Sequence, residues 1–217
     1  MSELFDEVDE EVRREQLKKL WDKYSIYFIA LMVLIVAAVG GWRGYQYLEG
    51  KKAAEAGAAF EKAAELSDQG KHAEAETAFT DLAAKAPAGY RALARLRAAA
   101  EAASRDPKAA AKLYDDVAAD RSVGTEWQDL AKIRAAGLLL DGASYADMQQ
   151  RLETSAAPGA TFRHSAREML ALSAWRNGDM TAARKWLDAI AEDGETPPGL
   201  RSRAEALQAL LPTVAKS

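Results

Sequence analysis

The stretch "AEAETAFTDLAAKAP", residues 73–87, decides the fold because its pattern returns along the chain. Within it, Ala75, Phe79, Leu82 and Pro87 are spaced by four, three and five residues. A small residue followed four residues later by an aromatic ring suits the second helix of a helix–turn–helix repeat. The alanine lets the neighbouring helix approach closely, and the ring fills the groove between repeats.

The same spacing occurs again at regular intervals. Ala146 and Pro158 keep the overall distance of 12 residues with a poorer interior, and the four leading alanines are separated by 35, 36 and 36 residues. Ser122 and Gly194 stand where the first copy has its proline. The positions that repeat the first two spacings, and that we expect to pack between helices, are Ala110, Tyr114 and Val117, and then Ala182, Trp186 and Ala189.

The chain after residue 42 is alanine-rich, has almost no alternating β-branched runs, and is punctuated by short breaks such as "RDP" at 105–107 and "NGD" at 177–179. The segments between the breaks are about 12 to 17 residues long, which is typical of helices in antiparallel pairs. Asp106 and Ser144 are N-cap candidates, and Pro107 suits a first helical position. This pattern predicts an all-α fold.

These features resemble the tetratricopeptide repeat, whose unit is about 34 residues and whose second helix carries A-x3-F with a later proline. The resemblance is partial, because first helices such as "YRALARLRAAAEAA" lack the W-x2-L-G-x2-Y half of the pattern. An ordinary alanine-rich bundle is the alternative. In the repeat interpretation, "GLRSRAEALQALLP" is a helix that caps the open end of the solenoid.

A second stretch, "SIYFIALMVLIVAAVGG" at residues 25–41, is apolar. The 19 residues from Tyr24 to Trp42 carry no formal charge, and as a helix they rise about 28 Å, close to the thickness of a bilayer core. Aromatic rings and a base stand near its ends, where they suit the membrane–water interface; these residues include Tyr24, Tyr27, Trp42 and Arg43. The stretch therefore predicts a transmembrane helix over 24–42.

The same stretch could be an export signal cut near Ala38-Val39-Gly40, but its apolar run is longer than the usual 7–15 residues and its leader is acidic. A retained signal anchor is the better interpretation. Five bases lie in residues 9–23 and three in 43–57, so the positive-inside bias places the leader, 1–23, in the cytoplasm. Residues 43–217, the predicted solenoid, are then exported. An N-out protein with cytoplasmic repeats is the alternative.

The leader has two short apolar stripes, Phe5, Val8 and Val12, and then Leu17, Leu20 and Tyr24. They predict an amphipathic helical extension of the anchor. Its first half carries six acids before the first base, which disfavours binding to anionic lipid and leaves a cytoplasmic protein contact as the other interpretation.

Composition excludes several classes of function. The net charge of −4 provides no basic field for nucleic acid, and the absence of cysteine excludes disulfides and thiolate chemistry. The two histidines, His72 and His164, lie in no zinc or triad pattern, and no phosphate-binding or dinucleotide fingerprint occurs. We therefore expect no enzyme, no catalytic or metal site, no cofactor and no small-molecule substrate. Trp127, which opens a first helix, is the candidate for a partner contact.

Taken together, the leader "EVDEEVRREQLKKLWDKY", one membrane helix ending in "GWRGYQYLEGKKAAEAGAAFEKA" and the repeat segments resemble the bacterial YfgM-like proteins, ancillary subunits of the SecYEG translocon. The resemblance implies a type II inner-membrane protein. Its periplasmic repeats would bind other proteins and link the translocon to periplasmic chaperones of exported chains. A membrane-tethered coordinator of the cell envelope or of division would use the same architecture with other partners.

Overall fold

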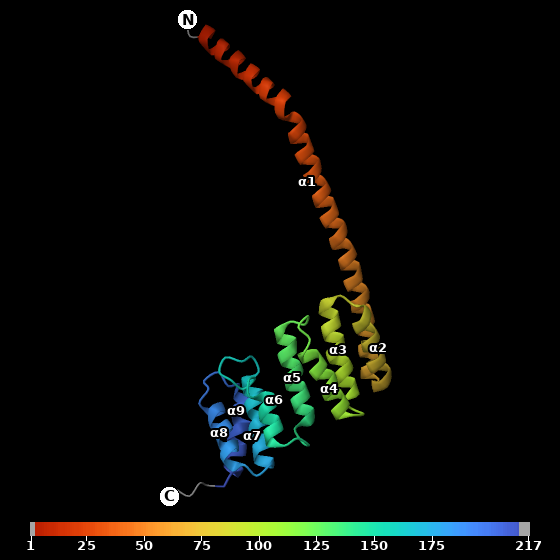
Figure 1. Ribbon diagram of the computed structural model, residues 1–217, viewed down its shortest axis with the longest axis vertical. Coiled ribbons are helices and arrows are strands. Elements are labelled where there is room, and N and C mark those ends of the chain that lie inside the picture. Colours follow the sequence, from red (N-terminus) through yellow and green to blue (C-terminus); the bar gives the residue numbers. More distant parts are fainter. Residues whose placement is uncertain (1–2, 213–217) are drawn as a thin grey trace. The chain divides into compact units, whose positions relative to one another are not determined.

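The computed structural model describes the backbone of residues 3–212 and the side chains of residue 14 and residues 17–212. Over these residues the chain forms nine helices and no strand, which confirms the all-α prediction (Figure 1). The chain divides into two compact units, Met1–Lys52 and Ala53–Ser217, and the first helix contributes to both. The helices are α1 (Glu3–Asp68), α2 (His72–Lys85), α3 (Ala88–Ala102), α4 (Pro107–Ala118), α5 (Thr125–Leu139), α6 (Tyr145–Leu152), α7 (Arg163–Arg176), α8 (Met180–Ala191) and α9 (Pro198–Leu210).

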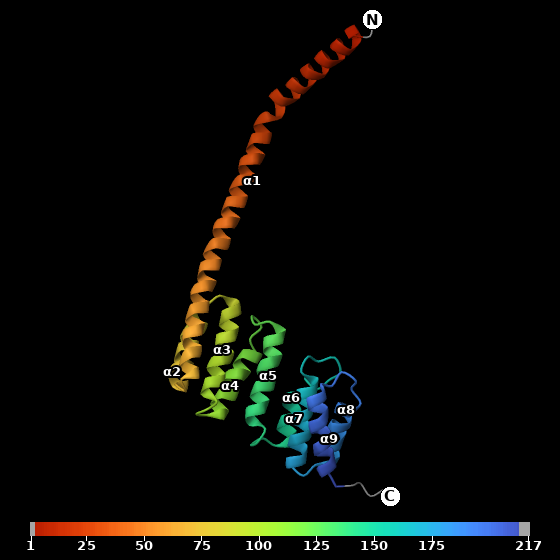
Figure 2. The same cartoon turned by 180° about the vertical axis from the view of Figure 1, so that it is seen from behind.

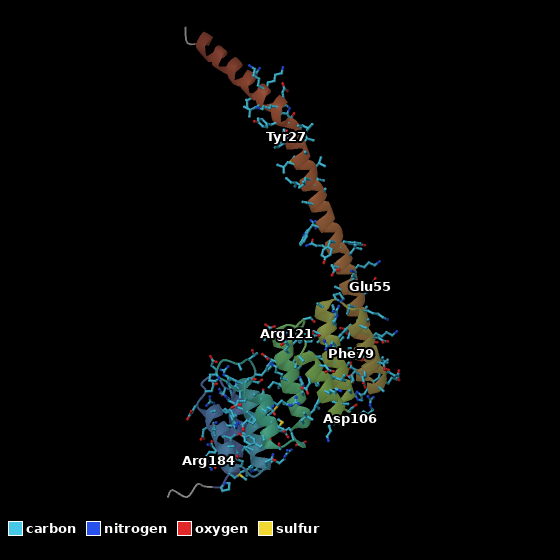
Figure 3. The ribbon with its side chains drawn as sticks, viewed as in Figure 1. Tyr27, Glu55, Phe79, Asp106, Arg121 and Arg184 are labelled. Atoms are coloured by element: carbon cyan, nitrogen blue, oxygen red, sulfur yellow. The ribbon has the colours of Figure 1, made fainter. Side chains whose placement is uncertain are left out.

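The described part of the first unit is helical, and the large apolar side chains described there are exposed. Between Leu17 and Asp68, α1 is long and apolar enough to cross a membrane, and none of its most apolar 18-residue window is buried. Tyr24, Tyr27 and Trp42 are half or more exposed, and Arg43 is exposed as well. Figure 3 shows side chains projecting from this part of α1 around Tyr27. The expected stripe of Phe5, Val8 and Val12 lies outside the side chains that the structure describes.

Helix starts in the second unit follow local hydrogen bonding. The Asp106 carboxylate accepts from the backbone N–H groups of Lys108 and Ala109, both at 3.0 Å, and Pro107 opens α4. The Ser144 hydroxyl accepts from the N–H of Asp147 at 3.2 Å. Both expected N-caps are therefore confirmed, since each satisfies backbone donors that the first helical turn leaves unpaired.

The helices of the second unit follow one another in chain order, with short connections between most neighbours (Figures 1 and 2). Of the odd-numbered helices, α3, α5 and α7 each pack on two sides. α3 turns Ala94 and Ala98 toward α1 and α2, and it turns Ala92, Leu96 and Ala99 toward α4 and α5. Four apolar clusters result, one for each successive group of helices. Alanine on these helices allows close approach from both sides, which is how a repeat stack buries a continuous core.

The first two copies of the sequence pattern form the expected kind of buried stripe. Ala75, Phe79 and Leu82 are buried on α2, where the Phe79 ring lies 5.1 Å from that of Phe60. Ala110, Tyr114 and Val117 are buried in the same way on α4. The stripe follows from helical spacing, because residues three and four apart share one face.

The later copies differ from the expected register. On α8 the fully buried residues are Ala183, Leu187 and Ile190, one position after the residues in the pattern, and Ala182, Trp186 and Ala189 are only partly buried. The Trp186 indole N–H donates to the Tyr145 hydroxyl at 2.9 Å, so the ring lies at the edge of two clusters where its polar atom finds a partner. On α6 Ala146 is exposed, and Met148 and Leu152 fill the core.

Candidate functional site

An apolar cavity of about 560 Å³ runs across three odd-numbered helices of the second unit, and we call it the central groove. Cavities of this size fall within the range that proteins use to bind ligand groups. α5 lies in the middle, with α3 and α7 on either side. The lining residues are Ala100, Ala103, Tyr114, Leu130, Ile133, Arg134, Gly137, Leu138, Phe162, Ser165, Glu168 and Met169.

Helical periodicity explains why one short sequence supplies both core and groove. In α5, Leu130, Arg134 and Gly137 recur at intervals of four and three residues and face the groove. Ala131 and Ala135, one position away from two of them, belong to the cluster shared with α3 and α4. A helix placed between two neighbours thus keeps a third face for solvent or for a partner.

The groove has an uneven charge distribution. Arg134 is exposed, and Arg97 on α3 lies with its guanidinium 5.5 Å above the Phe79 ring. Among the described residues neither arginine forms an ion pair, and the Arg97 Nε is buried without a hydrogen-bond partner. Burial raises the pKa of the Tyr114 hydroxyl, and the positive charges of Arg134 and Arg97 oppose that rise. Arg134 lines the groove, whereas Arg97 lies outside its lining and acts on it through the Tyr114 hydroxyl.

The carboxylates near the groove are already bound within the chain. Glu168 accepts from the Arg203 guanidinium of α9 at 2.7 and 3.0 Å. Glu101, which is almost fully buried, accepts from the Ser67 hydroxyl at 2.7 Å and lies 2.7 Å from the His72 imidazole. Of the two charged side chains that line the groove, Glu168 is paired with Arg203, and Arg134 forms no ion pair among the described residues.

Trp127, the candidate partner contact, lies near the start of α5 and is 36% exposed. It precedes Leu130 by three residues and Arg134 by seven, which places it on the same helical stripe as the groove-lining residues. Trp175, near the end of α7, is exposed to a similar degree. Neither tryptophan is among the residues that line the groove.

The histidines are both engaged with carboxylates. The His72 imidazole is hydrogen-bonded to one carboxylate oxygen of Glu101, and the other oxygen accepts from the Ser67 hydroxyl. The serine therefore donates to the acid and not to the imidazole. His164 Nε2 lies 3.1 Å from Asp193, which also accepts from Arg163 at 2.8 Å and Arg167 at 2.9 Å. These networks join helix ends, which is a structural role. Among the described residues, no group of three or more acidic or histidine side chains is placed to hold a metal.

The Asp193 network shows the strongest electrostatic effect in this part of the chain. Hydrogen bonding from Arg163, with further bonds from the Glu195 amide, Arg167 and His164, holds the pKa of Asp193 well below its usual range. Arg167 is itself buried and donates to the backbone carbonyls of Ala156 and Ala189. The network fixes the connection between α6 and α7 against the connection after α8.

A stack of helical hairpins with an open groove on its odd-numbered helices defines a repeat domain built for contact with other molecules. A comparison with protein families matches residues 18–197 to the family described as "Tetratricopeptide repeat-like domain", and the chain belongs to that family. No curated protein and no solved structure matches the chain in the corresponding searches. The class thus rests on the family match and on the helical architecture.

The periodic sequence pattern pointed to the second helices and missed the groove itself. Arg134, Gly137, Phe162 and Met169 are ordinary residues in sequence and become a site only when α5 and α7 lie side by side. One signal was present. Gly137 interrupts an otherwise good helix-forming segment, "AKIRAAGLLL", where glycine is about 1 kcal/mol less favourable than alanine.

Proposed function

We propose that the chain is a membrane-anchored scaffold that binds other proteins through the central groove. The observation that carries the proposal is the groove, an apolar cavity of about 560 Å³ on a tetratricopeptide repeat-like domain. Such domains are interaction modules, and binding on them requires surface and not a reactive group. The exposed apolar stretch of α1 supports the anchoring part of the proposal, because its apolar side chains have no protein cover.

In its more specific form, the proposal makes the chain an ancillary subunit of the Sec translocon in the bacterial inner membrane. The repeat domain would lie in the periplasm and bring periplasmic chaperones to newly exported chains. Support comes from the resemblance of the leader, anchor and repeat segments to YfgM-like proteins, and from the five-to-three excess of bases before the apolar stretch. Tethering would raise the local concentration of partner and client without any new contact.

Affinity purification of the full chain in mild detergent, followed by identification of the retained proteins, tests the scaffold role. Ser165 lies in the groove and is partly buried, and its hydroxyl forms no hydrogen bond with another described residue, so Ser165→Trp should fill the cavity. Ser202→Trp on the exposed side of α9 makes the same change away from the groove. Partners should be lost with Ser165→Trp and kept with Ser202→Trp; equal retention by both variants would remove the groove from the proposal.

Alkaline phosphatase fused after Ser217 tests the orientation, since that enzyme matures only after export. An active fusion is expected if residues 43–217 are exported. An inactive phosphatase fusion, together with a fluorescent cytosolic reporter at the same position, would place the repeats in the cytoplasm. Trp127→Ala should weaken partner capture if the exposed ring makes a contact, whereas His72→Ala and His164→Ala should leave it intact, because neither imidazole is needed for surface binding.

A further inference from the structure

The part of α1 just before its apolar stretch carries an apolar face that the chain itself does not cover. Leu17, Leu20, Trp21 and Tyr24 are between 50% and 69% exposed. At about 100° per residue they fall within an arc of about 100° on one side of the helix, and we call them the leader face. The Trp21 ring lies 6.1 Å from the ring of Phe28, so the leader face runs directly into the apolar stretch.

Two exposed lysines border the leader face, one on each side. Lys18 and Lys23 each lie about 60° beyond opposite edges of the arc. The Lys23 Nζ lies 5.4 Å from the centre of the Tyr24 ring, and Lys19 and Asp22 lie on the opposite side of the helix. Basic residues in these positions are typical of a helix in the membrane–water interface, because their stems cover apolar surface while their ammonium groups reach the headgroups.

The charge of the leader changes sign shortly before the leader face. Residues 3–11 carry six acids and no base, whereas residues 13–23 carry five bases and two acids. An anionic membrane surface therefore repels the first range and attracts the second. The charge complementarity favours anionic headgroups over neutral ones, and it does so only where the apolar face is also present.

A straight continuation of the membrane helix would leave much of the leader face in water. Leu17 precedes Tyr24, where the uncharged stretch begins, by seven residues or about 10 Å along the helix axis. The polar layer on each side of a bilayer core is only about 5–7 Å thick. A helix that lies along the surface instead places its apolar side chains at the boundary between headgroups and acyl chains.

We propose that residues 14–24 lie along the membrane surface and bind anionic lipid headgroups through Lys18 and Lys23, with the leader face turned into the bilayer. This contact lies beyond the scaffold function and rests only on its membrane-anchored part. The placement needs α1 to change direction before it crosses the membrane. Within the first unit, α1 bends on the N-terminal side of Tyr27 (Figures 1, 2 and 3).

The absence of cysteine from the chain allows a nitroxide label to be attached at one chosen position at a time. Single cysteines replace Leu17, Lys19, Leu20 or Asp22 in the full chain, which is placed in lipid nanodiscs that contain phosphatidylglycerol. Paramagnetic resonance measures the access of each label to oxygen, which enters the bilayer, and to a neutral nickel chelate, which stays in water. We expect a high ratio of oxygen to nickel access at Leu17 and Leu20 and a low ratio at Lys19 and Asp22. A ratio that rises steadily along the four positions would show a helix that runs straight through the headgroups, and would overturn the proposal.

A second arm tests the headgroup contact with the label at Leu17. Lys18→Gln together with Lys23→Gln should lower the ratio of surface-bound to unbound label about fivefold for each lysine. Lys51→Gln together with Lys52→Gln makes the same charge change beyond the other end of the apolar stretch and should leave the label unchanged. Discs of phosphatidylcholine alone should give the parent chain the same loss as the first variant. Equal ratios in both kinds of disc, with and without the lysines, would overturn the assignment to anionic headgroups.

The anchor and the lipid contact fail differently in these measurements. A chain that does not remain with the discs contradicts the anchor, and both the anchor and the lipid contact are then wrong. A chain that remains with the discs while its label at Leu17 stays open to water contradicts the lipid contact alone. Shielding of Leu17 that occurs in membranes with the cell's other proteins, and is absent from anionic discs, would show that a protein covers the leader face and that the lipid assignment is wrong.

Discussion

The apolar stretch of α1 and the core of the repeat domain differ in how much of their apolar side-chain surface the chain itself covers. Ile26, Tyr27, Val33 and Leu34 are each more than 60% exposed, whereas Phe79, Leu170 and Leu187 are almost fully buried. Each square ångström of apolar surface left in water costs about 25 cal/mol. Helices stacked on alanine remove that surface in the repeats. In the apolar stretch of α1, that surface can leave water only by entering another apolar medium. The length of the stretch matches the thickness of a bilayer core.

The comparison also explains the difference in composition. The odd-numbered repeat helices need small side chains because neighbours approach from two sides, and alanines such as Ala94, Ala99 and Ala135 are fully buried. The apolar stretch of α1 needs large apolar side chains and no close packing against neighbouring helices, and it is rich in isoleucine, leucine and valine. Substitutions in the two regions should therefore act on different equilibria, membrane insertion in one and folding in the other.

The largest expected effect is on the apolar stretch. Each arginine near the centre of a membrane helix costs about 2.5–3.5 kcal/mol on insertion scales, so Leu31→Arg together with Leu34→Arg should release the chain from membranes. Leu113→Arg, on the exposed side of α4, adds a charge to the repeats and should not. The measurement is the fraction in the pellet after carbonate extraction. Full retention of the double variant would show that the stretch is not the anchor.

Truncation in the repeat core should come next. Phe79→Ala removes a fully buried ring that contacts Phe60 and lies below Arg97, and should destabilise the domain by about 3–5 kcal/mol. Tyr47→Ala removes a ring that is 73% exposed in the first unit and should leave domain unfolding unchanged. Thermal denaturation of both full chains in detergent measures the difference. Similar midpoints for the two variants would contradict the assignment of Phe79 to the core.

A smaller effect is expected at the displaced register of α8. Tyr145→Phe leaves the Trp186 indole N–H without the acceptor that it has at 2.9 Å, and should cost about 1 kcal/mol. Trp186→Phe removes the donor of the same hydrogen bond. The double variant should therefore lose less stability than the sum of the two single variants, because the two residues share one interaction. A double-mutant cycle by chemical denaturation measures the coupling. Fully additive losses would show that the bond does not contribute.

The last effect is read from its pH dependence and comes from the paired acids. The pKa of Asp193 is held well below its usual range, first by Arg163, and the Ser122 hydroxyl and amide with Arg95 lower the pKa of Asp120 to about 2. Because the folded pKa lies below the unfolded value of about 3.9, this stabilisation is complete above about pH 5 and is lost progressively as pH falls through 4 toward 2. Asp193→Asn should flatten the dependence of the thermal midpoint between pH 5 and 2. An unchanged slope would contradict the pairing.

Much of the helical framework could be predicted from the sequence, because local signals are strong. Asp106 and Ser144 mark helix starts through backbone hydrogen bonds, and the spacing of Ala75, Phe79 and Leu82 defines one helical face. The shift by one residue in α8 could not be predicted, because the buried face of α8 is set by packing against α7 and α9, and Trp186 finds its acceptor on Tyr145, 41 residues away. The groove could not be predicted for the same reason. Its residues come from α3, α4, α5 and α7 and share no local pattern.

Photocrosslinking in intact cells tests most directly whether the repeat domain binds proteins through the central groove. A benzophenone amino acid at Ser165, inside the groove, is compared with the same residue at Lys112, on the exposed side of α4. We expect discrete protein adducts from position 165 that are absent from position 112 and that disappear when Gly137→Arg fills the groove. Adducts of equal yield at both positions, or none at 165 in a chain that retains its partners, would contradict the scaffold account.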